Sequence, residues 1–282
     1  MSYEVVKQEH VEHLGDKPFN KRSMNSNNHV SPLAKGQIHE GVSGIDVRLV
    51  QGIDEEAFQK TAGMAVRATI GIDPDAPPEE MPWEEMLKGG LQTALETQTI
   101  VFGVSGVSRT CTHQLVRSRR AAFHQQSQRA SHMGDWPNVR MPQSIAENTE
   151  ARIAFHRAVK YAHEAYSIAC DEDIAFQDAR FILPEGTETY ILCEYPLREF
   201  INAYAYRACY MFQWEISHVF REMKRVLTEA HPWLEPYIRI SCEVGQRCTF
   251  QGWESPEGHC PLPWGKDETR TYKPDPSLRI GK

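Results

Sequence analysis

Two patterns in the sequence predict a mixed α/β fold of the α+β type. Apolar residues alternate with polar ones at Ile45, Val47 and Leu49, a period of two that is typical of a strand with one buried face. Between residues 197 and 230 the apolar residues recur instead every three or four positions, as on the buried face of a helix. The chain has 282 residues, of which 40% are hydrophobic, and this is enough to bury a substantial core.

Strands and helices alternate through the first half of the chain, after a polar N-terminal arm. Residues 1–42 are rich in Asn and show little periodicity, so we interpret them as a loose segment. Asp54 is placed to cap a helix that follows the first strand. Several prolines between residues 74 and 82 predict an irregular connection. A second strand is predicted over 99–107, followed by a helix from Ser108 to about Arg119.

The second half of the chain predicts two long helices with strands between them. Ser144 and Glu147 have the spacing of a capping box, which predicts the start of a helix of about 20 residues. Residues 181–184 and 187–195 then read as two strands. The last helix is predicted to run without a break from Leu197 to about Ala230.

Composition limits the classes of function that the chain can have. The net charge of −7 argues against a general nucleic-acid binder, which needs a basic surface. The seven cysteines include no CxxC pair, and no signal peptide is recognisable, so we expect reduced thiols and a cytoplasmic protein. No apolar stretch approaches the roughly 20 residues that span a bilayer, so no membrane partner is expected.

The segment 114–129 contains the densest group of arginines in the chain. Arginine presents a fixed fork of donors that suits phosphate or carboxylate groups and stays charged at physiological pH. In an acidic protein such a cluster predicts a focused site for a small anion. An Arg-x-Arg pair alone lies more often on a solvated surface than in a binding site. The residues around the pair therefore have to distinguish these two possibilities. The arginines are Arg117, Arg119, Arg120 and Arg129.

That wider pattern resembles the signature of the flavin-dependent thymidylate synthases, the ThyX family. The signature has Arg-His-Arg, seven residues and then Ser, and here it reads Arg117-Ser118-Arg119, seven residues and Ser127. Two further stretches, 178–189 and 197–216, resemble later segments of the family in the same order. The resemblance covers about residues 45–232 of one ThyX-like domain and leaves out the arm and an irregular C-terminal extension, 233–282. It implies a mainly antiparallel sheet with long helices, in a homotetramer whose active sites lie at subunit interfaces.

The resemblance also implies an activity. Members of the family make dTMP from dUMP by reductive methylation at C5, without a cysteine nucleophile. The methylene group comes from methylenetetrahydrofolate and the hydride from NADPH through FAD. Arg207 matches the catalytic residue, which stabilises negative charge on the uracil. The positions matched to nucleotide binding are Gln114, Arg117, Gln125, Gln126, Ser127, Gln128, Arg129, Arg180 and Arg207. Those matched to FAD binding are Thr93, Arg117, Ser118, Arg119, Gln125, Arg198 and Asn202.

Two residues depart from the family pattern inside the signature. Ser118 stands where the family has histidine, and Gln125 stands where it has glutamate. The arginines that match phosphate-binding positions are unchanged, so nucleotide binding is the firmer expectation. A relative that methylates UMP in a nucleoside biosynthetic pathway is the alternative that fits such changes.

Helix geometry bears on how one helix can serve two ligands. At 3.6 residues per turn, Arg198 and Asn202 lie about 40° apart, whereas Arg207 lies about 180° from Arg198. The three side chains therefore cannot converge on one compact pocket within a straight helix. We expect this helix to serve both flavin and nucleotide near a subunit interface. A monomer that binds FAD tightly would contradict this expectation.

Three other interpretations compete with this one. Cys111 could act as a covalent nucleophile, but on a predicted helix it more often packs as a small apolar residue. A metal site in the C-terminal part would need paired ligand spacings that the sequence lacks. A non-catalytic nucleotide or RNA-binding protein would interleave aromatic residues with the arginines, and only Phe123 does so. The candidate metal ligands are Cys242, Cys248, His259 and Cys260.

Overall fold

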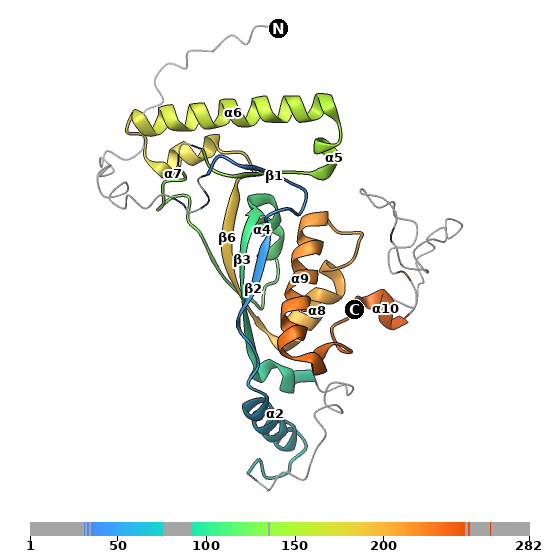
Figure 1. Ribbon diagram of the computed structural model, residues 1–282. Helices are drawn as coiled ribbons and strands as arrows, with labels where there is room; N and C mark the ends of the chain where they lie inside the picture. The colour runs from blue at the N-terminus through green and yellow to red at the C-terminus, as the bar shows by residue number, and fades with distance from the viewer. Residues whose placement is uncertain are drawn as a thin grey trace, which may run out of the picture.

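The computed structural model (Figure 1) describes residues 31, 33, 35–75, 92–134, 136–245, 248 and 260. The strands are β1 (Ile38–Glu40), β2 (Asp46–Gln51), β3 (Thr99–Ser108), β4 (Ala122–Gln125), β5 (Val139–Met141) and β6 (Glu188–Pro196). The α-helices are α2 (Glu55–Thr69), α4 (Arg109–Leu115), α5 (Gln143–Ala146), α6 (Thr149–Asp171), α7 (Phe176–Ala179), α8 (Leu197–Arg207), α9 (Trp214–Ala230) and α10 (Ser241–Gly245). Short 3-10 helices are η1 (Gln92–Thr97), η2 (Arg180–Ile182) and η3 (Pro232–Leu234).

The main sheet is antiparallel throughout, with the strand order β2-β3-β6-β4. Alternate residues of its long central strand β3 are buried, among them Ile100, Phe102 and Val104. These residues pack with apolar side chains of α8 and α9, which lie along the sheet in Figure 1. The predicted mixed fold with an antiparallel sheet and long helices is therefore confirmed. The strand predicted around Val47 is β2, and the Asp54 Oδ1 caps α2 by accepting the Ala57 N–H at 3.0 Å.

A small parallel sheet joins the end of the predicted arm to the body of the protein. Strand β1 pairs with β5, with Ile38 opposite Val139 and Glu40 opposite Met141. The interpretation of residues 1–42 as a loose arm is therefore wrong for 38–40, because parallel pairing with a distant strand leaves no local pattern. Residues 1–30 lie outside the described residues. In Figure 1, α6 lies across the same end of the molecule as β1.

Two local predictions about the middle of the chain are wrong. The capping box does not start the long helix, because α5 is a single short turn and Asn148 caps α6 through a bond from the Ala151 N–H to its Oδ1 at 3.0 Å. The strand predicted over 181–184 is the 3-10 turn η2 and an extended residue, Leu183. A short apolar run does not distinguish a strand from a turn that packs on a helix.

The long C-terminal helix is broken into two helices, α8 and α9, between Arg207 and Trp214. Gln213 begins the second helix, since its Oε1 accepts the Ile216 N–H at 3.1 Å. The carbonyl of Ala208, at the end of the first helix, accepts hydrogen bonds from the side chains of Ser217 and Arg221. Side-chain donors from α9 thus satisfy a carbonyl at the end of α8. The apolar residues keep the same spacing on both sides of the break, so the sequence pattern does not show where the helix ends.

The C-terminal extension contributes to the main core where the structure describes it. Leu234 at the end of η3 and Ile238, Ile240 and Cys242 after it are buried and join the main hydrophobic core. The prediction of an irregular extension is wrong for 241–245, which form α10.

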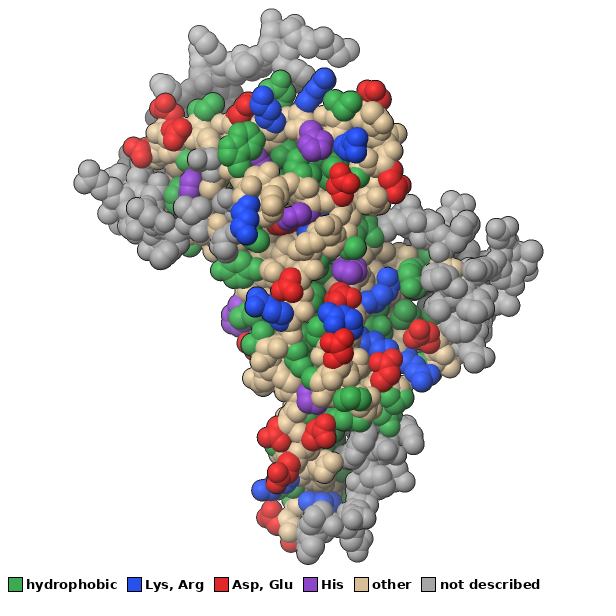
Figure 2. Space-filling view, in the orientation of Figure 1, with side chains coloured by type: hydrophobic (Ala, Val, Ile, Leu, Met, Phe, Trp, Pro, Cys, Tyr) green, Lys and Arg blue, Asp and Glu red, His purple; other side chains and the backbone are tan. Residues whose placement is uncertain are grey.

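The surface in Figure 2 mixes charges of both signs over α9. There Arg225 forms ion pairs with Glu222 and Glu229, each at 2.8 Å. Within the part of the chain that the structure describes, no helix combines the length and the apolar character needed to cross a bilayer.

Candidate active site

Helix α4 ends in a turn that presents the arginine cluster. The Ser108 Oγ accepts a hydrogen bond from the backbone at the start of α4 and donates one to the Glu215 Oε2 at 2.6 Å. The predicted helix to Arg119 is wrong, because α4 ends at residue 115 and the arginines follow it. Arg117 and Arg119 are exposed, whereas Ser118 between them is only 8% exposed. Two guanidinium groups therefore face solvent from a turn whose central residue faces the core.

Ser118 neighbours the buried side chain of Tyr195, on β6. Burial raises the pKa of Tyr195, and the Ser118 hydroxyl lowers it in part. The positive charge of Arg207 on α8 also lowers the pKa of Tyr195. The central residue of the arginine turn therefore packs against the main sheet.

Strand β4, which the sequence did not predict, delivers residues 125–129 from the edge of the main sheet. The Gln125 Nε2 donates to the Thr112 Oγ1 of α4 at 2.9 Å. The Ser127 Oγ accepts the backbone N–H groups of Arg129 and Ala130, each at 3.3 Å. Since both bonds use oxygen lone pairs, the hydroxyl proton of Ser127 remains available for an acceptor outside the loop. Ser127 and Arg129 are exposed.

Two members of the same loop face inward. Gln126 and Gln128 are 7% and 8% exposed. The Gln126 N–H donates to the Tyr190 carbonyl at 3.1 Å, and its Nε2 lies 3.7 Å from the Met133 Sδ. These glutamines fix the loop against the sheet. Gln114, on α4, is half-buried.

Arg180 lies near a second arginine that the sequence analysis did not single out. The Arg180 Nε donates to the Gln177 carbonyl at 3.1 Å. The Arg109 Nη1 donates to the Gln126 carbonyl at 3.4 Å. Burial lowers the pKa of Arg109; the Glu185 carboxylate opposes this effect, and the positive charge of Arg180 adds to it. The only sequence signal for Arg109 is its place at the start of the predicted helix, two residues after the predicted strand.

Three of the residues matched to flavin binding, Thr93, Arg198 and Asn202, lie on η1 and α8. The Arg198 Nη1 lies 2.9 Å from the Glu96 Oε1, and the Arg120 Nη1 lies 3.8 Å from the same oxygen. Thr93, also on η1, and Asn202, one turn along α8, are exposed. Glu96 thus links α8 to the arginine turn.

Arg207 is the last residue of α8, and the break after it fixes its place. The guanidinium carbon of Arg207 lies 5.4 Å from the centroid of the Phe212 ring. The Arg221 side chain holds the following Ala208 carbonyl, with its Nη2 at 3.1 Å. Arg198, Asn202 and Arg207 all lie on one helix, as predicted.

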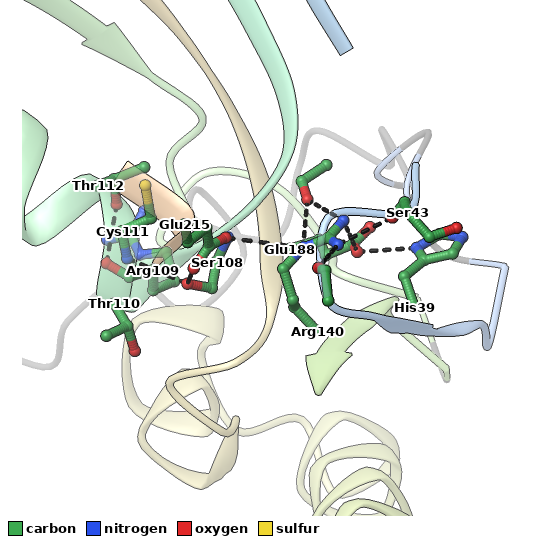
Figure 3. A network of polar contacts seen from close by, with 12 residues as sticks. His39, Ser43, Ser108, Arg109, Thr110, Cys111, Thr112, Arg140, Glu188 and Glu215 are labelled. Carbon is green, nitrogen blue, oxygen red and sulfur yellow. Dashed lines mark hydrogen bonds and ion pairs between the residues drawn. The ribbon is translucent and has the colours of Figure 1, made fainter. Parts of the chain in front are cut away.

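A buried ionic cluster, shown in Figure 3, lies next to the start of α4. We call His39, Arg140, Glu188 and Glu215 the Arg140 network. The Arg140 Nη2 lies 2.8 Å from the Glu188 Oε1, and the same oxygen lies 2.8 Å from the His39 Nδ1. The Arg140 Nε lies 3.6 Å from the Glu215 Oε1. Because Glu215 also binds Ser108, the network connects the small parallel sheet to the start of α4. The sequence analysis missed all four residues.

The surroundings of Cys111 do not suit a nucleophile. Cys111 is fully buried in α4, and burial, with the nearby Glu215, raises the pKa of its thiol well above the ordinary value. A nucleophilic cysteine needs the opposite, an accessible thiol with a lowered pKa. In the described ranges, no three His, Cys, Asp or Glu side chains are grouped to hold a metal ion. His259, one of the candidate ligands, lies outside the described residues.

Comparison with known proteins places this geometry in a family. The family profile described as "Thymidylate synthase complementing protein" matches residues 60–233. A flavin-dependent thymidylate synthase of Geobacter sulfurreducens is 34% identical over 186 residues, which cover 64% of this chain and 80% of that protein. One from Pyrococcus abyssi is 34% identical over 168 residues, which cover 58% of this chain and 68% of that protein.

Solved structures agree on the fold. The UMP/dUMP methylase PolB from Streptomyces cacaoi, bound with 5-Br dUMP, superposes with a TM-score of 0.56 at 18% identity over 68% of this chain and 92% of that one. Thymidylate Synthase X from Helicobacter pylori, with FAD and dUMP, superposes with a TM-score of 0.53 at 16% identity over 69% of this chain and 99% of that one. The protein described here, with its arginine turn, its loop 125–129 and its broken C-terminal helix, belongs to the family of flavin-dependent thymidylate synthases.

Proposed function

We propose that the protein is an enzyme that methylates C5 of dUMP to give dTMP. The methylene group would come from methylenetetrahydrofolate and the hydride from NADPH through FAD. One observation carries the proposal: Arg120 of the arginine turn and Arg198 of α8, far apart in sequence, lie 3.8 Å and 2.9 Å from the same Glu96 oxygen. Relatives at 34% identity bear the name flavin-dependent thymidylate synthase, which supports the same reaction.

The nucleotide would bind to the loop 125–129 and the arginines near it. The free hydroxyl proton of Ser127 suits an anionic oxygen, and exposed Arg117 and Arg129 offer bidentate donors for a phosphate. Gln125 would orient the ligand from its bond to Thr112. The full set that we assign to the nucleotide is Gln114, Arg117, Gln125, Gln126, Ser127, Gln128, Arg129, Arg180 and Arg207.

FAD fits the residues at the junction of η1, α8 and the arginine turn. A dinucleotide with two phosphates needs several cationic donors, and exposed Arg119 and half-buried Arg198 supply them here. Ser118 is buried, so its side chain would hold the turn in place while the exposed residues on either side of it bind FAD. When bound, the flavin supplies the hydride chemistry. The residues that we assign to FAD are Thr93, Arg117, Ser118, Arg119, Gln125, Arg198 and Asn202.

Arg207 would carry the catalytic role. Uracil C5 becomes a nucleophile only when negative charge accumulates on the ring, and a fixed guanidinium stabilises that charge with little reorganisation. The position of Arg207 is fixed by the bonds that Ser217 and Arg221 make to the Ala208 carbonyl. No nucleophile from the protein is needed for this activation.

We further propose a cytoplasmic homotetramer with active sites completed by neighbouring subunits. Val50, Tyr190 and Leu192 are large apolar residues that the single chain leaves exposed on the sheet. A Cβ at Gly103 would lie 3.4 Å from the Val50 Cγ2 and 3.7 Å from the Leu192 Cδ2, so these two side chains are neighbours. A contiguous apolar face of this kind suits a subunit contact. The seven cysteines are free thiols, in keeping with a reducing compartment.

Anaerobic turnover with FAD, NADPH and methylenetetrahydrofolate tests the reaction, with dUMP and UMP compared as substrates. We expect a yellow protein that converts dUMP to dTMP. Methylation of UMP in preference to dUMP would identify the specialised nucleotide methylase instead. A colourless protein that refuses FAD and retains RNA would contradict the enzyme, as would failure to methylate either nucleotide.

Replacing Cys111 with alanine tests the absence of a cysteine nucleophile. We expect turnover to stay within about twofold of the wild type and stability to fall by about 1 kcal/mol, the loss typical of a small change in a core. Cys193→Ala is the matched control, since both thiols are fully buried. Loss of turnover in Cys111→Ala alone, with dUMP binding preserved, would restore the covalent mechanism.

A further inference from the structure

Arg109 lies where three parts of the proposed nucleotide site meet. It is the first residue of α4, and its backbone N–H donates to the Thr187 carbonyl at 3.1 Å, after the segment that carries Arg180. Its Nη1 reaches the carbonyl of Gln126 in the loop 125–129 at 3.4 Å. The side chain therefore spans from the end of β3 to the loop that holds Ser127.

The positive charge of Arg109 is opposed by the Glu185 carboxylate, which forms no ion pair with it. In the described part of the chain, neither Arg109 nor Arg180 has a carboxylate oxygen within 4.0 Å of its guanidinium nitrogens. The carboxylate of Glu185 acts on the pKa of Arg109, but it is exposed and lies 3.9 Å from the His113 Nδ1. The positive charge of Arg180 also acts on Arg109 and disfavours its charged state. An anion bound by both side chains removes this cost.

The hydrogen-bonding capacity of the two arginines is also largely unused. The Nη1 of Arg109 makes one long bond to Gln126, and the Nε of Arg180 makes one to Gln177. Among the described residues, the remaining N–H groups of both forks have no hydrogen-bond partner. A phosphate monoester offers three oxygens, which suit two forks that approach from different sides.

We propose that Arg109 is a further substrate-binding residue, which holds the 5′-phosphate of the nucleotide together with Arg180 and anchors the loop 125–129 to α4. The inference rests on the proposed function, because it takes the substrate to be a nucleoside monophosphate. A flavin phosphate has the same chemistry, so the test compares both sources.

Equilibrium binding to the full-length protein tests the proposal, with dUMP, inorganic phosphate and FAD as separate probes. We expect Arg109→Gln to weaken dUMP by about 10- to 100-fold, the loss of a charge-assisted contact, and to weaken inorganic phosphate by a similar factor. FAD affinity should not change. Arg109→Lys should recover part of the loss, since lysine keeps the charge without the fork.

Arg225→Gln is the matched control, because Arg225 is an exposed arginine whose ion pairs lie on α9. It should leave all three affinities unchanged. Unchanged dUMP binding in Arg109→Gln overturns the inference, and so does a loss confined to FAD. Loss of dUMP without loss of inorganic phosphate would show a role in loop structure only and also overturns it. A wild-type protein that binds neither dUMP nor phosphate overturns the proposed function as well.

Discussion

Replacing Arg140 with methionine should lower the free energy of unfolding by about 3–5 kcal/mol, the cost of breaking a buried ion pair on one side. The side chains of Arg140 and Glu188 are each 1% exposed, and that of Glu215 is 2% exposed. Removing the guanidinium leaves two buried carboxylates without the cation that lies between them and the main-chain groups it binds, and His39 contacts only one of the two, Glu188. Burial already raises the pKa of Glu215, so this carboxylate depends on its remaining partners to stay ionised.

The guanidinium of Arg140 also donates hydrogen bonds to three main-chain carbonyls. Its Nη1 donates to the carbonyls of Gly41 at 2.6 Å and Ser43 at 2.8 Å, and its Nε donates to that of Gly106 at 2.8 Å. Gly106 has a φ of 74° and lies at the register shift in β3. The irregular part of this strand is therefore in direct contact with Arg140. Methionine matches the volume of the side chain but supplies none of these donors, so the variant tests the charge and the hydrogen bonds together.

Urea unfolding of four variants measures the effect: Arg140→Met, Glu188→Gln, the double variant and a control. Arg48→Met is the matched control, because Arg48 pairs with Asp46 at 3.1 Å on an exposed stretch of β2 and should contribute about 0–1 kcal/mol. The double variant Arg140→Met with Glu188→Gln should be less destabilised than the sum of its single changes, by about 0.5–3 kcal/mol. A loss below about 1 kcal/mol in Arg140→Met would contradict the proposed role of the Arg140 network.

The sequence predicted the elements whose signal is local. The alternation in β3 and β6 and the cap at Asp54 involve neighbours in the chain, and the structure confirms them. The break after Arg207 depends on Ser217 and Arg221, which reach back to a carbonyl eight or more residues earlier. The Arg140 network joins residues 48 to 149 positions apart. Such contacts are set by packing, and a single sequence does not show them.

For the candidate site, spacing identified the residues of the linear signature but not their orientation. Arg117 and Ser118 are neighbours in the motif, yet one is exposed and the other faces Tyr195. Arg109 lies outside the signature, and it became a candidate only when the fold brought it to Gln126 and Arg180.

Replacing Arg207 with glutamine should lower kcat for dUMP methylation by about 10²–10³-fold, the usual effect of removing one preorganised donor to a developing anion. The charge on uracil grows as the reaction proceeds, so the lost interaction should affect kcat more than KM. The fold should remain intact, because Arg207 is half-buried at the last turn of α8 and the Ala208 carbonyl after it is held by other side chains. Its own contribution to that helix end, as a cation near the C-terminus, is about 0.3–1 kcal/mol.

Steady-state kinetics, flavin absorbance and thermal melting together isolate the catalytic effect in Arg207→Gln. Arg207→Lys keeps the positive charge but presents a single ammonium group in place of the planar fork, so its kcat should fall less. Arg225→Gln serves again as the control, and its kcat should match the wild type. If Arg207→Gln raises KM without lowering kcat, the residue binds the nucleotide equally in the ground state and the transition state, and the activation of uracil must come from another group.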